Sequence, residues 1–326
     1  VDSTVDITVT DEDDLTTDDH VLAVNKIVAA INSANDVTAS FEINKASAAK
    51  FSGVAAKDLT ITVTDAMSVT EFGTLDGVTS NSITLSEGII DDIGDLIETD
   101  DDGNLSVADD LTTAISENNT NDSKLAVEIE SEVTTDFAKV STLAAAANIG
   151  VITGSITGTA TELLNITGLD TSDDITFKLE SGASVLQLKN LSEDTSLSNI
   201  TFTSGNGISD DLDNLISNEQ RTNNFNTALA HLTSAPSITL SNTDLSAENV
   251  GDDGIKDFNA LAALNTIGGI TGTLSDDDGT YLLATTGDNV TAVATSDDDD
   301  ITFAYGTVDA SDGVVTKLIS NAQLDG

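Results

Sequence analysis

The triplet ITV, residues 61–63, is the first of several short strand-like triplets that recur at a fixed spacing. ITL begins at residue 83, LSV at 105 and VEI at 127, each 22 residues after the triplet before it. Alternating apolar and polar residues are typical of short strands, and a constant interval of roughly 20 to 50 residues is typical of repeat folds. The spacing therefore predicts that Ile61, Ile83, Leu105 and Val127 begin parallel neighbours in one sheet.

The series continues beyond this regular part of the chain. Further strand starts are expected at Ile152, Ile175 and Ile200, and then at wider intervals at Ile238, Ile270 and Ile301. Stretches with helical spacing and polar caps lie between the strands, for example at residues 87–98, 108–115 and 134–147.

A strand and a short helix cannot bury their apolar faces alone, so stacked coils are the economical solution. The pattern predicts an α/β fold, a solenoid of about 22-residue strand-helix coils with a parallel sheet. A right-handed parallel β-helix is the alternative. We expect three regions: an N-terminal strand-helix region at 1–58, regular repeats at 59–222, and C-terminal repeats with longer insertions at 223–326.

The composition limits the partners of this chain. Against 57 Asp and Glu it has 11 Lys and Arg, which gives a net charge of −46. Nucleic acids and anionic membrane surfaces are excluded as partners by charge repulsion, and salt or bound cations must reduce the self-repulsion. The absence of cysteine excludes disulfides and thiolate sites. No apolar run is long enough to span a bilayer.

Acidic turns are the candidate metal sites, and calcium is the expected ion because it binds six to eight oxygen ligands. The sequence DDDGN places Asp100, Asp102 and Asn104 at alternating positions, as at the start of an EF-hand-type loop, although Leu105 and Leu111 replace the expected Gly and acid. Carboxylates that precede strands are the other candidates, although such residues also serve simply to end a loop. These further candidate ligands are Asp173, Asp174, Asp276, Asp278, Asp299 and Asp300.

Catalytic patterns are scarce in the sequence. The two histidines, His20 and His231, lie beside apolar helix-like stretches and are expected to be surface or capping residues. Nucleophile-elbow, Walker, zinc-protease and dinucleotide-binding motifs are lacking. The chain is therefore expected not to be an enzyme.

The stretch ITGTATELLNITGLD, residues 156–170, carries a resemblance to a known group of proteins. It resembles the TGTAxELN repeats of very large secreted marine bacterial surface proteins, including cyanobacterial motility-associated proteins and adhesins, and is similar to repeats of marine phage tail fibres. It departs from them at Leu164, where the common repeat passes directly from Glu-Leu to Asn. The resemblance implies a long, repetitive, extracellular, calcium-associated molecule, without catalytic residues to carry over.

These observations favour a secreted, non-enzymatic structural or adhesive protein of a filament, sheath or surface layer. The alternative is a polysaccharide-acting solenoid lyase or hydrolase, against which the single arginine, Arg221, and the two tyrosines argue. Strand-like VDITVT at residues 5–10 and apolar GVVTKLISNAQL at 313–324 predict head-to-tail self-association. A surface polysaccharide is a further candidate partner.

Overall fold

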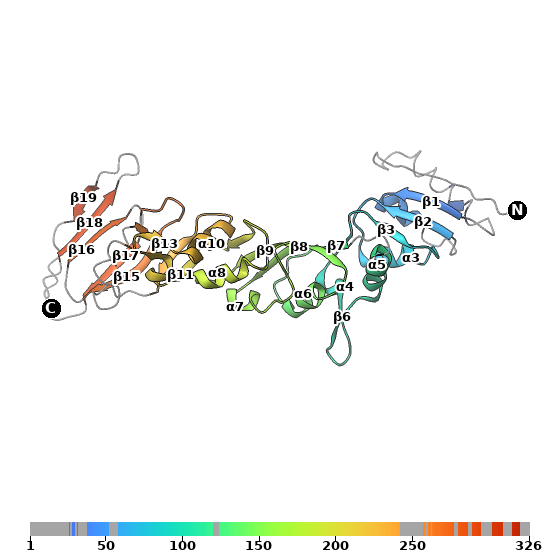
Figure 1. The fold of residues 1–326 in the computed structure, drawn as a ribbon, viewed down its shortest axis with the longest axis horizontal. Coiled ribbons are helices and arrows are strands. Elements are labelled where there is room, and N and C mark those ends of the chain that lie inside the picture. Colours follow the sequence, from blue (N-terminus) through green and yellow to red (C-terminus); the bar gives the residue numbers. More distant parts are fainter. Residues whose placement is uncertain are drawn as a thin grey trace. The chain divides into compact units, whose positions relative to one another are not determined.

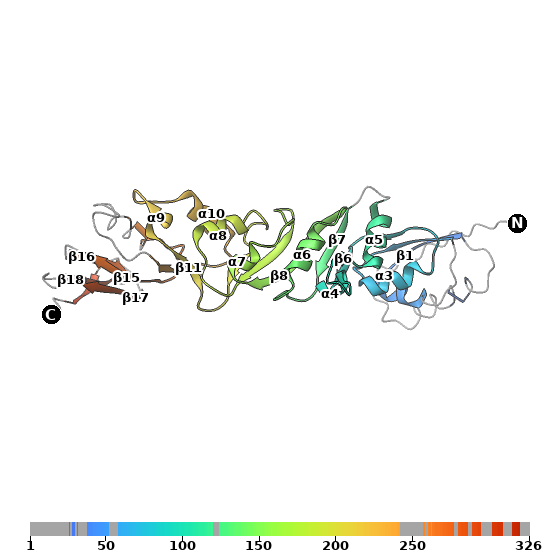
Figure 2. The ribbon, with the colours of Figure 1, turned by 90° about the horizontal axis from the view of Figure 1, so that it is seen from below.

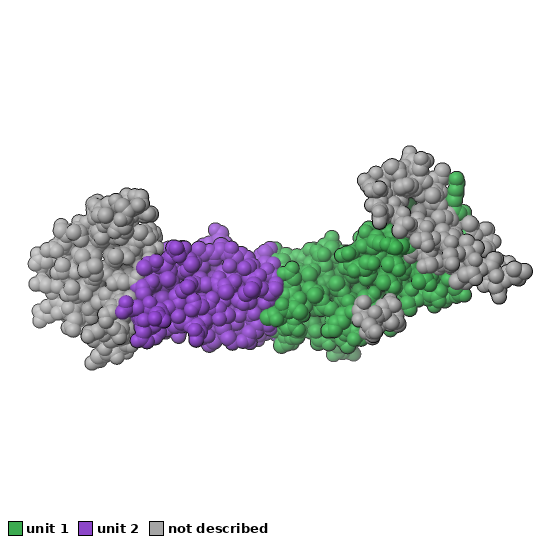
Figure 3. All heavy atoms as spheres, turned by 45° about the horizontal axis from the view of Figure 1, so that its top comes forward, with its two compact units in different colours: residues 1–155, 166–175 green, residues 156–165, 176–326 purple. Residues whose placement is uncertain are grey.

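The computed structural model describes residues 42–51, 58–118 and 124–241 in full. It also describes isolated positions at residues 26–31 and 257–270, and the backbone alone of residues 38–41 and of strands between residues 271 and 319. The chain divides into two compact units, which Figure 3 shows in different colours. The first consists of Val1–Ser155 and Ile166–Ile175, and the second of Ile156–Asn165 and Thr176–Gly326.

The first unit opens with three parallel strands in the order β1-β2-β3. Strand β1 (Thr38–Ile43) pairs with β2 (Asp58–Val63), and β2 pairs with β3 (Ile83–Leu85). Ile61 lies opposite Ile83 and both are fully buried, because alternate residues of a strand point to the same face. This confirms the predicted parallel pairing of Ile61 with Ile83.

A strand begins at Leu105 as predicted, but its predicted parallel pairing is wrong. Strand β6 (Leu105–Val107) pairs antiparallel with β5 (Ile97–Thr99). The turn between them contains Gly103 with φ +84°, a conformation that favours glycine. A local hairpin therefore satisfies the backbone groups of LSV before a longer crossover can form.

Val127 consequently has other neighbours than the predicted Leu105. In strand β7 (Leu125–Ile129), Val127 lies opposite Ile89 of β4 (Ile89–Asp91) and opposite Ile152 of β8 (Ile149–Gly158), both in parallel. The first-unit strands of this sheet run in the order β8-β7-β4. Parallel pairing from residue 127 to 152 agrees with the predicted series, whereas pairing with residue 89 does not.

Short helices connect the strands of the first unit. Helices α3 and α5 lie beside the β1-β2-β3 sheet in both ribbon views (Figures 1 and 2). The helices expected at residues 108–115 and 134–147 are present, whereas the stretch 87–98 forms β4, one helical turn and β5. The helices are α2 (Lys45–Ala48), the 3₁₀ turn η1 (Ala49–Phe51), α3 (Val69–Asp76), α4 (Ile93–Leu96), α5 (Asp109–Asn119) and α6 (Phe137–Ala144).

The second unit uses the same kinds of element. Ile238 and Ile270 lie opposite each other in parallel strands, as the series predicts. In its described strands the other pairs are also parallel, apart from β12 with β13 and β18 with β19. The elements are α7 (Ala160–Leu163), β9 (Asp174–Leu179), α8 (Val185–Leu191), β10 (Ile200–Phe202), β11 (Gly207–Asp210), α9 (Leu212–Leu215), β12 (Ile216–Ser217), β13 (Gln220–Arg221), α10 (Asn223–His231), β14 (Ser237–Leu240), β15 (Ile270–Asp276), β16 (Thr280–Thr285), β17 (Asn289–Ala294), β18 (Thr302–Val308) and β19 (Val315–Ile319).

The chain is thus a mixed α/β protein with mostly parallel strands. Its core consists largely of Ile, Leu and Val, with single aromatic side chains such as Phe72 and Phe225 filling the space under the helices. Searched over the described residues, the structure contains no helix of the length and apolarity needed to cross a membrane.

Two stretches with similar sequences adopt the same structure, one in each unit. GIIDDIGDLI, residues 88–97, and GISDDLDNLI, residues 207–216, each form a strand, a one-turn helix and the start of the next strand. In the first, Ile89 lies opposite Val127, and in the second, Ile208 lies opposite Ile238. The local geometry is therefore the same in both units.

Candidate functional site

The best predicted calcium ligands lie at the tip of the β5–β6 hairpin. One carboxylate oxygen of Asp100 accepts hydrogen bonds from the backbone N–H groups of Asp102, at 3.0 Å, and Asn104, at 2.7 Å. The other accepts from the Asn104 amide at 2.9 Å. These bonds to Asn104, first from its side chain and then from its backbone, lower the pKa of Asp100. The carboxylate therefore stays charged and holds the turn together from within.

The two aspartates before strand β9 have different surroundings. Asp173 is 5% exposed, and its oxygens accept from the N–H groups of Ile152 at 2.8 Å and Asp170 at 3.0 Å. Its neighbour Asp174 is exposed. Asp173 satisfies two backbone donors at the start of a strand, which agrees with its interpretation as a residue that ends a loop.

The remaining calcium candidates lie toward the C-terminus. Asp276 ends strand β15, but its side chain lies outside the described part, as do Asp278, Asp299 and Asp300. Within the described part of the chain, the structure has no group of three or more His, Asp or Glu side chains arranged to hold a metal. Binding of calcium stays a prediction.

His231 is buried, so its expected surface position is wrong. It ends helix α10 with 9% of its surface exposed, and its Nδ1 has no hydrogen-bond partner among the residues that the structure describes. The apolar residues Phe225 and Ala228, which precede it on the same helix, are also buried and explain this placement. His20 lies outside the described residues.

A cleft beside helix α3 in the first unit was not predicted. It has a volume of about 230 Å³, and its walls include Ala48, Met67 and Leu75. The Lys45 ammonium lies 2.9 Å from the Glu71 carboxylate at this cleft. Burial raises the pKa of Glu71, but hydrogen bonds from Ser68 and the charge of Lys45 outweigh it, so the net pKa is lowered.

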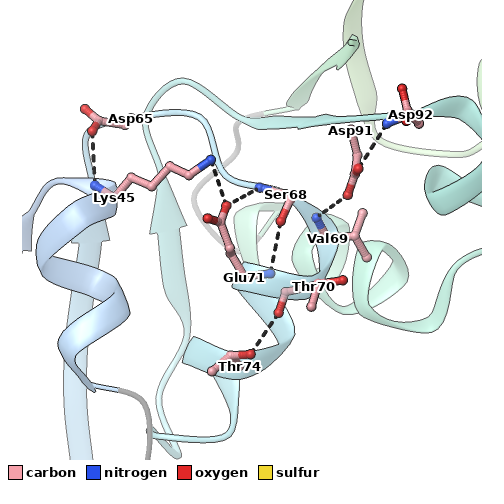
Figure 4. Close-up of polar contacts among 9 residues, drawn as sticks. All are labelled: Lys45, Asp65, Ser68, Val69, Thr70, Glu71, Thr74, Asp91 and Asp92. Atoms are coloured by element: carbon pink, nitrogen blue, oxygen red, sulfur yellow. Dashed lines mark hydrogen bonds and ion pairs between the residues drawn. The ribbon is translucent and has the colours of Figure 1, made fainter. Parts of the chain in front are cut away.

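The start of helix α3 explains why Glu71 is held there. Ser68 and Glu71 form a capping box: the Glu71 N–H donates to Ser68 Oγ at 3.2 Å, and the Ser68 N–H donates to Glu71 Oε2 at 2.9 Å. The Val69 N–H donates to Asp91 Oδ2 at 3.0 Å, and Asp91 is the last residue of strand β4 (Figure 4). The sequence signal for this cap is the S-x-x-E pattern at 68–71.

The same cap is present on helix α8 in the second unit. Ser184 and Gln187 form its capping box, and the Val185 N–H donates to Asp210 Oδ2 at 2.8 Å. Asp91 and Asp210 therefore have the same role: each connects the end of a strand to the start of the helix that precedes that strand in the sequence. Because both carboxylates are used in this way, we assign them to the scaffold.

A second hollow lies in the second unit, around Arg221. It has a volume of about 520 Å³ and lies between helix α10 and the loop that follows it. Among the described residues, the Arg221 guanidinium has no hydrogen-bond or ion-pair partner. The sequence signal is the single arginine in an acidic chain, although its position in a hollow depends on the fold. A hollow of this size, with one cation and several hydroxyl groups, is suited to a small anionic group.

Comparisons of the chain with the profiles of known protein families, with curated proteins and with solved structures give no match. The two units of the chain can nevertheless be compared with each other. Residues that keep their role in both, such as Asp91 and Asp210, belong to the scaffold. The β5–β6 hairpin and the Arg221 hollow are present in one unit each, which makes them the strongest candidates for specific binding.

Proposed function

We propose that this chain is a non-enzymatic extracellular protein that forms part of a filament, sheath or surface layer, or an adhesin on such a layer. The proposed architecture is a solenoid in which coils of strand and short helix follow one another. In such an architecture every coil packs against the coil before it and offers the same kind of surface to the coil after it.

One observation carries the proposal: the same connection between coils is built twice. The backbone N–H of Glu130 donates to Asp91 O at 3.0 Å, and that of Ser241 donates to Asp210 O at 3.0 Å. Both aspartates also cap the helix of the preceding coil, through Val69 and Val185. A long, repetitive protein needs the same connection between successive coils many times, so the reuse of these residues supports the proposed architecture.

The composition supports an extracellular location in a saline medium. A net charge of −46 produces strong self-repulsion, which salt and divalent cations reduce. We propose calcium as that cation. The absence of cysteine makes the fold independent of the redox state of its surroundings.

Electron microscopy of the protein in calcium-containing saline tests this function. Filaments, sheets or a layer on cell-surface material are the expected result. The same preparation should be assayed against acidic and neutral polysaccharides, by release of reducing ends for a hydrolase and by ultraviolet absorbance of unsaturated products for a lyase. Turnover of any of them by particles that neither assemble nor adhere would overturn the proposal.

A further inference from the structure

The two units differ most in the connection between the one-turn helix and the long helix that follows it. In the first unit this connection is the β5–β6 hairpin, which carries DDDGN at its tip and protrudes at the label β6 in Figure 1. In the second unit it is the short β12–β13 pair, which ends at Arg221. The first unit thus has an acidic projection where the second has a cation beside a hollow.

The hairpin tip is a preorganised projection. Three hydrogen bonds to the carboxylate of Asp100 fix the turn, and backbone bonds join Asp100 to Gly103 and Asn104 at 3.0 Å each. The carboxylates of Asp101 and Asp102 are exposed, and neither has a hydrogen-bond or ion-pair partner in the part of the chain that the structure describes. Two negative charges are therefore presented on a turn that loses little entropy on binding.

The Arg221 hollow has the complementary chemistry. A guanidinium group recognises a carboxylate through two parallel hydrogen bonds. Among the described residues, no carboxylate is bound to the Arg221 guanidinium. Asn226, Thr233 and Ser234 at the hollow offer donors for the carbonyl groups of a turn, while Leu229 and Pro236 supply apolar walls. The volume of about 520 Å³ lies within the range of small-ligand sites, roughly 300–1,000 Å³, and suits the tip of a turn.

We infer that the acidic tip of the β5–β6 hairpin, Asp101 and Asp102 above all, docks into the Arg221 hollow of a second copy of this chain. The inference rests on the proposed function and names the contact through which copies associate. The two surfaces are different and each chain carries both, so the contact is heterologous and leads to an open chain of copies. The negative net charges of two copies repel each other and oppose docking. A moderate rise in salt screens this repulsion and strengthens docking, whereas high salt also screens the ion pair and weakens it.

Sedimentation velocity of full-length variants in saline tests the inference. Arg221→Gln removes the cation, and Asp101→Asn with Asp102→Asn removes the charges of the tip. All three positions are exposed, so the fold is retained, which circular dichroism checks. Each variant alone should associate about tenfold more weakly than the unchanged chain, the effect of losing one charge-assisted contact. Lys50→Gln and Asp95→Asn, which remove exposed charges elsewhere, should leave association unchanged.

Mixing the two variants gives the decisive result. The Arg221→Gln chain keeps an intact hairpin, and the Asp101→Asn, Asp102→Asn chain keeps an intact hollow, so the mixture should form dimers that do not grow further. Variants that associate like the unchanged chain, or a mixture no different from its components, would overturn the docking while leaving the proposed function in place. An unchanged chain that stays monomeric at every salt concentration but adheres to surface material would also overturn the docking. An unchanged chain that neither assembles nor adheres would refute the proposed function itself.

Discussion

The carboxylate of Asp210 should be the most important single polar group of the second unit. It is 7% exposed and accepts hydrogen bonds from the N–H of Val185 at 2.8 Å, the N–H of Asp211 at 2.9 Å and the amide of Asn214 at 2.7 Å. Asp210→Ala removes both oxygens and with them all three hydrogen bonds. Asp211 and Asn214 are partly or fully exposed and can turn to water, but Val185 is 1% exposed and its N–H would remain unpaired.

The expected cost follows from that one buried donor. A hydrogen bond to a charged group contributes about 1.5–3 kcal/mol, and a buried donor without a partner costs a similar amount, so Asp210→Ala should lower the free energy of unfolding of the second unit by about 3 kcal/mol. Asp91→Ala should lower the free energy of unfolding of the first unit by about half that amount. Asp91 is only partly buried and accepts two bonds, both at 3.0 Å.

Amide hydrogen exchange in urea measures the two units separately, which a single melting curve cannot do. Exchange of the α8 amides should become about a hundredfold faster in Asp210→Ala, since 1.4 kcal/mol corresponds to a factor of about ten. Asp213→Asn is the matched control, because burial and the charges of Asp257 and Asp211 raise the pKa of Asp213 and its neutralisation removes repulsion. If Asp210→Ala is no less stable than this control, the capping argument is wrong.

Three further outcomes are expected. Burial, and then the charge of Glu193, raise the pKa of Asp194 to about 6, so this carboxyl destabilises the fold above that pH and the penalty disappears as the pH falls toward 3.8. Asp194→Val should raise the free energy of unfolding by about 1 kcal/mol at pH 7, after allowance for solvent screening, and should remove this pH dependence from urea titrations. Gly207→Ala should cost about 2–3 kcal/mol in the same titrations, because a Cβ there would overlap the Ser237 carbonyl oxygen, whereas Gly94→Ala, with open space around it, should cost nothing. Calcium should raise the melting temperature at low salt by several degrees more than sodium at equal ionic strength. If sodium reproduces the whole increase, calcium acts only by screening the negative charges.

Several features of the fold followed from the sequence alone. The α/β class and the parallel pairing of Ile61 with Ile83 and of Ile238 with Ile270 were predictable, because buried strands carry their pattern locally and the chain repeats that pattern. The similarity of GIIDDIGDLI to GISDDLDNLI is a further signal in the sequence for the local structure that the two stretches share.

The position of LSV at residue 105 was decided by competition between two pairings. A triplet at the expected spacing can join a parallel neighbour or fold back on the chain directly before it. The short distance to β5 and the turn at Gly103 favour folding back, since a small loop closes at low entropic cost. Spacing alone contains no information about that competition.

By itself, the sequence determined the class of the fold, the acidity and the repetition of short strands, since these depend on composition and on neighbours along the chain. Only the tertiary structure decided what each polar residue does. Asp173 and Asp210 look like any other Asp in an acidic turn, yet they cap backbone groups of residues 21 and 25 positions away. Arg221 lies in a hollow that α10 and the following loop form together. Such roles depend on burial and on partners far away in the sequence, which come together only after the strands and helices have packed.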